Sequence, residues 1–312
     1  MKNSHNNLSF FRSAPTFPSL RTDLACESIN ASGGAPGTSY REYSFSSIPI
    51  SELTVMEGRG EAATGRKAGR YITLHTGAMR YIDEDRKSEL SEAIANVIST
   101  LTESITKKSI TQSTKVLVAG LGNRFISADS VGPRTADKIA VTSHMLESSH
   151  GDIFRLLGCS SISAVHPGVM GQTGIEAAAM IKGACDYVKP DVVIAVDALA
   201  ARSTKRLCAT VQLSDTGIEP GSGIGNRRGA VNSTTIGFPV IALGVPTVVD
   251  SATLVFDALI GAGITKLDPS LEEALNGEEN FFVSPKDSDI VCEEISAVLA
   301  SAINKAFLAD GL

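Results

Sequence analysis

Short apolar runs bounded by turn residues recur through the middle of the chain and predict buried β-strands. Three of these runs show no alternation between polar and apolar residues: Lys115–Ala119, Asp191–Asp197 and Pro239–Leu243. Such runs are typical of parallel strands that are covered on both faces. A further strand is predicted at Ser160–Val165. The residues before about position 45 are polar and rich in turn formers, which predicts a loop.

Helical patterns alternate with these strands. Apolar residues at positions i, i+3, i+4, i+7 and i+11 indicate one amphipathic helix: Ile94, Val97, Ile98, Leu101 and Ile105. Gly132-Pro133 opens another helix, because proline at the first helical position loses no useful hydrogen bond. From Leu207 to Leu213, apolar residues alternate with polar ones such as Gln212, which predicts a half-exposed strand. Alternating strands and helices predict an α/β fold around a largely parallel sheet.

The composition narrows the class of protein. Of 312 residues, 43% are hydrophobic and 20% are charged, values that are ordinary for a globular protein and exclude a disordered or collagen-like chain. Lys plus Arg (28) against Asp plus Glu (34) gives a net charge of −6. That charge argues against a nucleic-acid binder, because phosphate binding relies on clustered basic residues. The basic cluster Arg66, Lys67 and Arg70 is therefore interpreted as a solvated loop.

The sequence contains no recognisable targeting signal or membrane span. The first twenty residues hold no continuous apolar stretch, and prolines and glycines interrupt the most apolar internal run, Ile236–Val249. Five cysteines without metal-like spacing suit a reducing compartment. We therefore expect a soluble cytoplasmic protein with no membrane partner.

Reactive residues just beyond the strands are the candidates for catalysis, because ligands of open α/β sheets bind past the carboxyl ends of the strands. Asp129 follows the first buried strand, Asp197 ends the second, and His166 follows the strand at Ser160–Val165. Each aspartate has an alternative interpretation as a helix cap, and His166 as polar surface. Two carboxylates that meet in one crevice can share a proton, one acting as base and the other as acid. The pair is therefore the strongest candidate site, and His166 is a weaker candidate metal ligand.

Gly120 and Gly122 match the first two glycines of the dinucleotide-binding motif G-x-G-x-x-G. That motif also needs a third glycine, where this chain has Phe125, and a helix that starts directly after the strand. We therefore expect the two glycines to allow the backbone to pass close to a pocket. A non-catalytic binder of a peptide or nucleotide stays as the alternative from another functional class.

Several longer motifs resemble those of the germination protease family of spore-forming bacteria. They are Gly120–Asn123 with Ala128–Pro133, Pro167–Glu176, Asp197–Ser203, Ser214–Asn226, Ile241–Asp250 and Gly69–Leu74. The resemblance runs in order from about Leu20 to Asp250. The leader, residues 28–47 and the region beyond Phe256 match poorly.

The resemblance implies an endopeptidase that degrades small acid-soluble spore proteins during germination. It implies no cofactor, and it identifies Asp129 and Asp197 as the two essential aspartates. The family fold is similar to that of hydrogenase-maturation endopeptidases, a three-layer α/β fold around a largely parallel or mixed sheet. In those enzymes an acidic residue at the same spacing binds nickel. A metal-dependent endopeptidase is therefore the alternative mechanism; His166 keeps it open, but the resemblance assigns no role to that position.

The resemblance also implies a zymogen. Arg21–Ala25 is similar to the processing site of the family, so the cut is predicted between Asp23 and Leu24. The order acidic, apolar, alanine in this segment copies the cleavage sequence of the spore proteins. These expectations divide the chain into a leader, residues 1–23, and a single α/β peptidase domain, residues 24–312. A homotetramer in the forespore or spore core is implied as well.

The chemistry expected of the aspartate pair is activation of water. One ionised carboxylate would take a proton from water, while its protonated partner polarises the carbonyl or protonates the amine. The sequence does not assign these roles, because coupled carboxylates titrate as a pair. Backbone amides of four residues are candidates for holding the developing oxyanion: Gly122, Asn123, Gly168 and Gly171.

Overall fold

The computed structural model describes residues 22–28, 34–147, 151–156, 158–221, 229–264, 268, 270 and 281–308. Most of the predicted leader, residues 1–21, lies outside the described residues. Two of its residues, Thr22 and Asp23, lie inside them, together with Leu24 beyond the predicted cut.

Within the described residues, a mixed sheet of nine strands forms the centre of the molecule, in the order β1-β2-β3-β7-β8-β6-β4-β5, with β9 beside β8. One half is parallel and consists of β8 (Val240–Asp250), β6 (Val192–Ala201), β4 (Lys115–Gly120) and β5 (Ser161–Val165). The other half is antiparallel and consists of β1 (Thr38–Phe45), β2 (Ile48–Val55), β3 (Gly69–Leu74) and β7 (Val211–Ser214). The short β9 (Phe282–Val283) pairs with the end of β8. The boundary between the halves is the β7–β8 pair.

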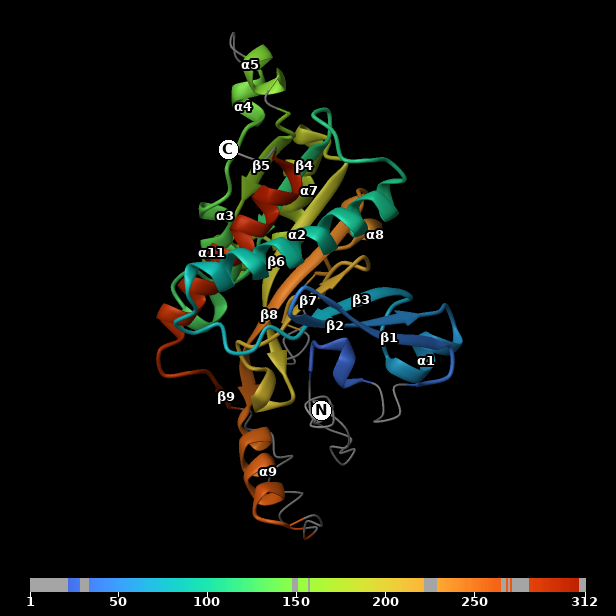
Figure 1. The fold of residues 1–312 in the computed structure, drawn as a ribbon, viewed down its shortest axis with the longest axis vertical. Helices are drawn as coiled ribbons and strands as arrows, with labels where there is room; N and C mark the ends of the chain where they lie inside the picture. The colour runs from blue at the N-terminus through green and yellow to red at the C-terminus, as the bar shows by residue number, and fades with distance from the viewer. Residues whose placement is uncertain are drawn as a thin grey trace, which may run out of the picture.

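Helices cover both faces of this sheet and make three layers (Figure 1). The first face carries α2 (Glu84–Thr106), α3 (Val131–Asp137) and α11 (Ser288–Phe307). The second face carries α7 (Ala177–Val188) and α8 (Ser233–Ile236). Shorter helices lie in the connections: α1 (Arg59–Thr64), α4 (Ser143–Leu146), α5 (Gly151–Leu156) and α6 (Met170–Thr173). The predicted α/β fold with a largely parallel or mixed sheet is confirmed.

The apolar runs form central strands because each face of the strand has a core to enter. In β6, Val192, Ile194 and Val196 belong to the core under α2 and α11. Val193 and Ala195 belong to the separate core under α7. Successive strand residues point to opposite faces, so a strand covered on both sides needs an unbroken apolar sequence.

Two predictions about element boundaries were wrong. The polar region before position 45 contains β1, an edge strand that pairs with β2 in an antiparallel hairpin. The runs that predicted β6 and β8 continue past their expected ends, to Ala201 and Asp250. The two extensions pair with each other through a bulge at Leu199/Ala200, and most of their residues are buried. As a result, Asp197 lies inside β6 and not at its end.

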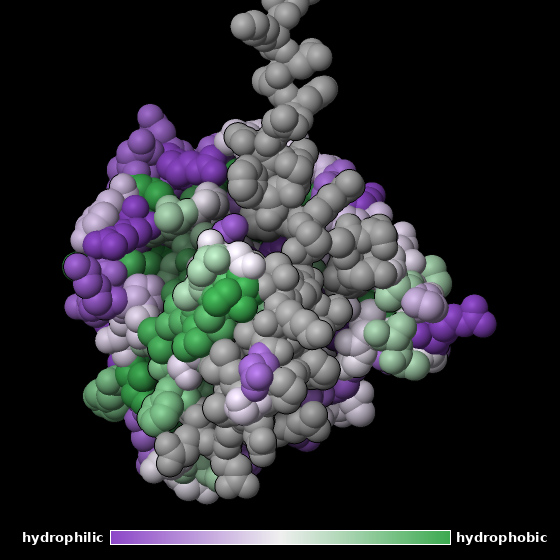
Figure 2. Space-filling model, turned by 90° about the horizontal axis from the view of Figure 1, so that it is seen from below, coloured by the Kyte–Doolittle hydropathy of each residue, from purple (hydrophilic) through white to green (hydrophobic). Residues whose placement is uncertain are grey.

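The helix α9 (Ser251–Gly261) projects from the lower end of the molecule in Figure 1. Its side chains Leu254 and Val255 are exposed. Seen from below, this end shows a patch of hydrophobic surface (Figure 2). Within the described ranges, no helix combines the length and the apolar character that crossing a membrane requires.

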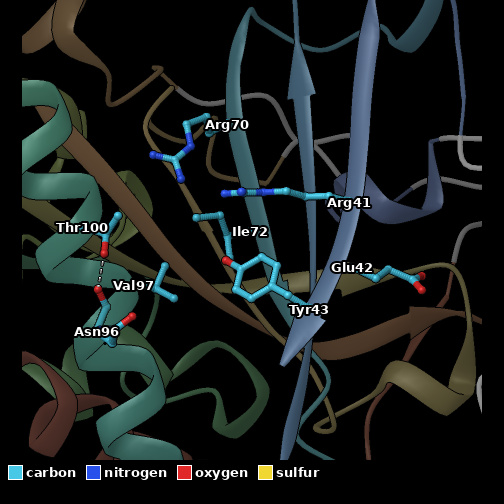
Figure 3. A pocket seen from close by; sticks show the side chains of 8 residues that line it. All are labelled: Arg41, Glu42, Tyr43, Arg70, Ile72, Asn96, Val97 and Thr100. Carbon is cyan, nitrogen blue, oxygen red and sulfur yellow. Dashed lines mark hydrogen bonds between the residues drawn. The ribbon is translucent and has the colours of Figure 1, made fainter. Parts of the chain in front are cut away.

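A hollow of about 280 Å³ lies between β1, β3 and α2. Arg41 and Arg70 extend toward one another there, and Asn96 and Thr100 of α2 line the opposite side (Figure 3). Both arginines bind the buried carboxylate of Glu52, at 2.7 and 2.9 Å. Burial alone would raise the pKa of Glu52, but the hydrogen bonds from Arg70 and Arg41 outweigh it and lower the pKa. Arg70 is therefore part of an ion-pair network around the buried Glu52, and the exposed Arg41 completes it at the surface.

Candidate active site

The candidate site lies where β4 ends and its neighbour β6 continues. The last residue of β4, Gly120, pairs with Val196, and the Leu121 N–H donates to the Val196 carbonyl at 2.8 Å. Asp197 is therefore the first residue of β6 beyond the end of β4. The chain leaving β4 leads to Asp129, so both aspartates follow the carboxyl end of β4.

Asp129 ends a short 3₁₀ helix, Ser127–Asp129, and its carboxylate holds the loop after β4. Its Oδ2 accepts a hydrogen bond from the Asn123 N–H at 2.8 Å. Gly122 lies against the same residue with φ +110°, and a Cβ there would be 2.2 Å from the Asp129 carbonyl oxygen. Glycine at position 122 therefore allows the backbone to pass close to another group, as expected, and that group is Asp129. The Asn123 amide, an oxyanion candidate, donates to Asp129 in this structure.

Asp197 is buried, with 4% of its surface exposed, and its Oδ1 accepts from the Ala198 N–H at 2.9 Å. Its side chain points to the second face of the sheet, because it follows Val193 and Ala195 in the alternation of β6. Burying a carboxylate is costly unless hydrogen bonds compensate for the lost water, and the Ala198 N–H supplies one of them.

The second pair of oxyanion candidates lies at α6. Gly168 precedes the helix with φ +70°, and Gly171, inside the helix, has no atom within 4 Å of the place of a Cβ. The neighbouring Gln172 reaches the loop after β4, where its Nε2 donates to the Asn123 Oδ1 at 2.7 Å. The two loops that the sequence singled out are thus joined through Asn123.

His166 is paired with a different carboxylate. Its Nε2 lies 3.5 Å from Oδ1 of Asp137 on α3, and Arg124 binds the other oxygen of Asp137. Among the residues that the structure describes, no group of three or more His, Cys, Asp and Glu side chains is placed to hold a metal ion. The described donors around His166 therefore do not fit a metal site, and no step is assigned to one.

The residues around the predicted cut, Thr22–Ser28, lie on the second face of the sheet and are named the N-terminal segment here. The Asp23 N–H donates to the Ala200 carbonyl, and the Ala200 N–H donates to the Asp23 Oδ2, both at 2.9 Å. The Leu24 side chain is fully buried against Leu199 and Val249. The segment therefore pairs with β6 only three residues beyond Asp197.

Arg66 fixes the segment from the other side. Its Nη1 donates to the Asp23 carbonyl at 3.0 Å, its Nη2 to the Thr22 carbonyl at 3.2 Å, and its Nε to the Ser28 Oγ at 2.8 Å. Burial lowers the pKa of Arg66. The prediction that this arginine belongs to a solvated loop was wrong, because the loop folds back onto the N-terminal segment.

A pocket of about 390 Å³ opens between the N-terminal segment and the sheet. Its walls include Asp23 and Arg66 on one side and Gln212 and Leu199 on the other. Gly244 of β8 forms part of its floor and is the direct cross-strand neighbour of Asp197. This pocket is a concave space on the face to which the Asp197 side chain points, and its lining includes Leu199 and Gly244 but not Asp197 itself.

The cysteines do not compete for the role of nucleophile. Burial raises the pKa of Cys208 to about 12 and that of Cys185 and Cys292 to about 11. Burial also raises the pKa of Cys26 and Cys159. Thiols held in their neutral form are poor nucleophiles, which supports the interpretation of these residues as packing.

His75, under the N-terminal segment, provides a test of the packing here. Its Nε2 lies 3.0 Å from the Ser51 Oγ, and burial, assisted by Arg206, lowers its pKa from 6.5 to about 4. Below about pH 6.5 the His75 imidazole therefore binds a proton in the unfolded chain but not in the folded chain. The folded state keeps its full stability above that pH and loses stability as the pH falls toward 4. We expect the unfolding free energy of the wild type to fall about 2 kcal/mol more than that of His75→Gln between about pH 7 and pH 4.5. Urea titrations at both pH values measure it, and equal losses would contradict the burial of a neutral imidazole.

Comparison with known proteins assigns the family. The family model of the germination protease matches residues 24–261. The germination protease of Caldanaerobacter subterraneus subsp. tengcongensis is 38% identical, over 92% of this chain and 94% of its own. That of Oceanobacillus iheyensis is 42% identical, over 77% of this chain and 66% of its own. Among solved structures, a NiFe hydrogenase maturation protease from Thermococcus kodakarensis is similar over 67% of this chain and 99% of its own, with 12% identity and a TM-score of 0.35.

The resemblance found in the sequence motifs is confirmed by these matches, which extend over most of the chain. The chain therefore belongs to the germination protease family and is a hydrolase of spore germination.

Proposed function

We propose that the protein is an aspartic endopeptidase that starts the degradation of small acid-soluble spore proteins, with Asp129 and Asp197 activating water. The observation that carries the proposal is the position of the Asp23–Leu24 bond. Leu24 packs on Leu199, which lies two residues beyond Asp197 on the same strand and the same face. Residues two apart in a strand are separated by about 7 Å. A bond of the predicted cleavage sequence therefore lies within a short distance of one of the two candidate carboxylates.

The sequence around the cut supports the substrate class, because each of its side chains has a matching environment. The Asp23 carboxylate accepts the Ala200 N–H, a contact that favours an acidic residue before the cut. Leu24 enters an apolar cluster. Ala25 is fully buried against Leu53, which leaves little room for a larger side chain. The acidic, apolar, alanine order of the spore proteins suits these three environments.

The proposed chemistry is hydrolysis with water as the co-reactant. The ionised carboxylate of the pair takes a proton from water as the water oxygen bonds to the carbonyl carbon, and the carbonyl π electrons move onto oxygen. When the C=O bond re-forms, the C–N bond breaks, and the nitrogen takes a proton from the protonated carboxyl group. The products are a new carboxyl terminus and a new amino terminus.

The proposal includes a zymogen with a leader, residues 1–23, and a mature domain, residues 24–312, acting in the forespore or spore core. It also includes a homotetramer, which the resemblance of the sequence motifs implies.

Incubation of the purified full-length protein tests the function. We expect a single new amino terminus at Leu24, read by intact mass and terminal sequencing, followed by cleavage of a peptide with the same acidic-Leu-Ala order. The processed protein should cut this peptide after its acidic residue and leave a matched peptide with lysine there uncut, since lysine repels the donor at Ala200. A chain that stays intact and cuts neither peptide would contradict the proposal.

A further inference from the structure

The carbonyl oxygen of Asp23 is held by two side-chain donors. Arg66 Nη1 and Gln212 Nε2 each donate to it at 3.0 Å. This oxygen belongs to the peptide bond for which cleavage is proposed, so it is the atom on which negative charge would develop. Two donors converging on one such oxygen are the arrangement of an oxyanion hole.

Gln212 spans the same bond from both sides. While its Nε2 contacts the Asp23 carbonyl, its Oε1 accepts a hydrogen bond from the Ala25 N–H at 2.6 Å. The two contacts bracket the Asp23–Leu24 peptide and keep it extended over the sheet. Arg66 has an equally fixed position, because its other nitrogens bind Thr22 and Ser28.

The sheet register places Gln212 and Asp197 on the two sides of one glycine. Gly244 of β8 pairs with Gln212 of β7 and with Asp197 of β6. Residues in register point to the same face, and adjacent strands are about 4.8 Å apart, so the two Cα atoms are about 10 Å apart across β8. Gly244 contributes no side chain to this interval, and Leu199 lies over it. The bracketed peptide and the Asp197 carboxylate thus share one face of the sheet.

We propose that Arg66 and Gln212 bind the carbonyl oxygen of the peptide bond that is cut, first in the leader and then in substrates. The inference rests on the proposed function and assigns a part of it that the glycine loops were expected to perform. As the water oxygen bonds to the carbonyl carbon, the π electrons move onto the oxygen between these two donors. When they return, the C–N bond breaks and the nitrogen takes the proton from the carboxyl pair. With the oxygen held in this way, the protonated carboxyl group is left to serve the leaving amine.

The decisive variant is Gln212→Glu in the full-length chain. Glutamate keeps an acceptor for the Ala25 N–H but presents a second oxygen to the Asp23 carbonyl in place of a donor. We expect the first-order rate of Leu24 terminus formation to fall about 100-fold, the usual effect of removing one such donor. Lys182→Gln is the control, because Lys182 is an exposed side chain of α7 that pairs with Asp186 and does not line the pocket. Its rate should stay within about threefold of the wild type.

A pH series separates this role from a structural one. Protonation of the introduced glutamate restores an O–H donor, so the ratio of the Gln212→Glu rate to the wild-type rate should rise between about pH 7 and pH 5. Urea unfolding of the variant checks that the fold persists. Processing of Gln212→Glu at the wild-type rate, or a ratio that does not change with pH, would overturn the inference while leaving the proposed function intact. A wild-type chain that cuts a different bond would overturn it as well. A wild-type chain that cuts no bond would overturn both.

Discussion

Asp197→Asn is expected to reduce both leader removal and peptide cleavage by 10²–10⁴-fold, the range that a positioned acid or base contributes to catalysis. The same loss is expected for Asp129→Asn. Asparagine is isosteric and keeps an oxygen for the Asn123 N–H that binds Asp129, so the loop after β4 should hold its shape. Rates from initial velocities at saturating peptide, together with the appearance of the Leu24 terminus, measure the effect.

The double variant and a control identify the pair as a unit. Because the effects of residues that act as a unit are not additive, the double variant should be no slower than the slower single variant. Asp137→Asn changes a surface carboxylate near the same edge, paired to His166 and Arg124, and should leave the rate within about twofold. Full turnover by either single variant would remove that aspartate from the mechanism.

Gly122→Ala is expected to produce the second largest effect. A methyl group there would lie 2.2 Å from the Asp129 carbonyl oxygen and 2.9 Å from its Oδ1, at a φ of +110°. Neither atom is the end of a long flexible side chain, so the loop has to move and carries Asp129 with it. Overpacking and backbone strain of this kind cost about 2–3 kcal/mol. We expect that loss in the free energy of unfolding and at least a tenfold loss of peptide cleavage.

Gly171→Ala is the comparison for this change. The position lies in α6, in the neighbouring loop, and a Cβ there has no atom within 4 Å. The free energy of unfolding and the activation free energy of peptide cleavage should both stay within about 0.5 kcal/mol of the wild type. Equal behaviour of the two alanine variants in urea unfolding would show that the loop at Gly122 is looser than its contacts indicate.

Elements with a strong local pattern were predictable from the sequence, and their extensions were not. The runs at Lys115 and Asp191 predicted β4 and β6 because both faces of these strands are buried. The continuation of β6 through Ala201 was missed, because its mixture of alanine and leucine has no strand preference of its own. Pairing with β8 across the bulge decides its structure. Similarly, β1 is polar and mostly exposed, so its sequence alone predicts a loop.

The same distinction applies to the site. Asp129 could be selected because the end of β4 is marked in the sequence and ligands bind past such ends. Asp197 was selected for the same reason, although β6 continues past it to Ala201. Arg66 and Gln212 could not be selected, because their contacts with Asp23 span 43 and 189 positions of the chain. The alternation around Gln212 predicted a polar face for its strand, but not what would lie on that face. Contacts made by folding distant segments together leave no local signal, so a composition argument assigned Arg66 to solvent.

Under the proposed function, the docking of the N-terminal segment links the substrate preference of the enzyme to removal of its own leader. The first peptide bound in the pocket is then part of the same polypeptide, and the backbone and side-chain groups that bind it would also bind a substrate protein. A substitution that adapts the pocket to a different substrate sequence would therefore weaken binding of the N-terminal segment, and the leader would not be removed. A redesign of substrate selectivity has to change the pocket and the N-terminal segment together, and each of them constrains which substitutions the other can accept.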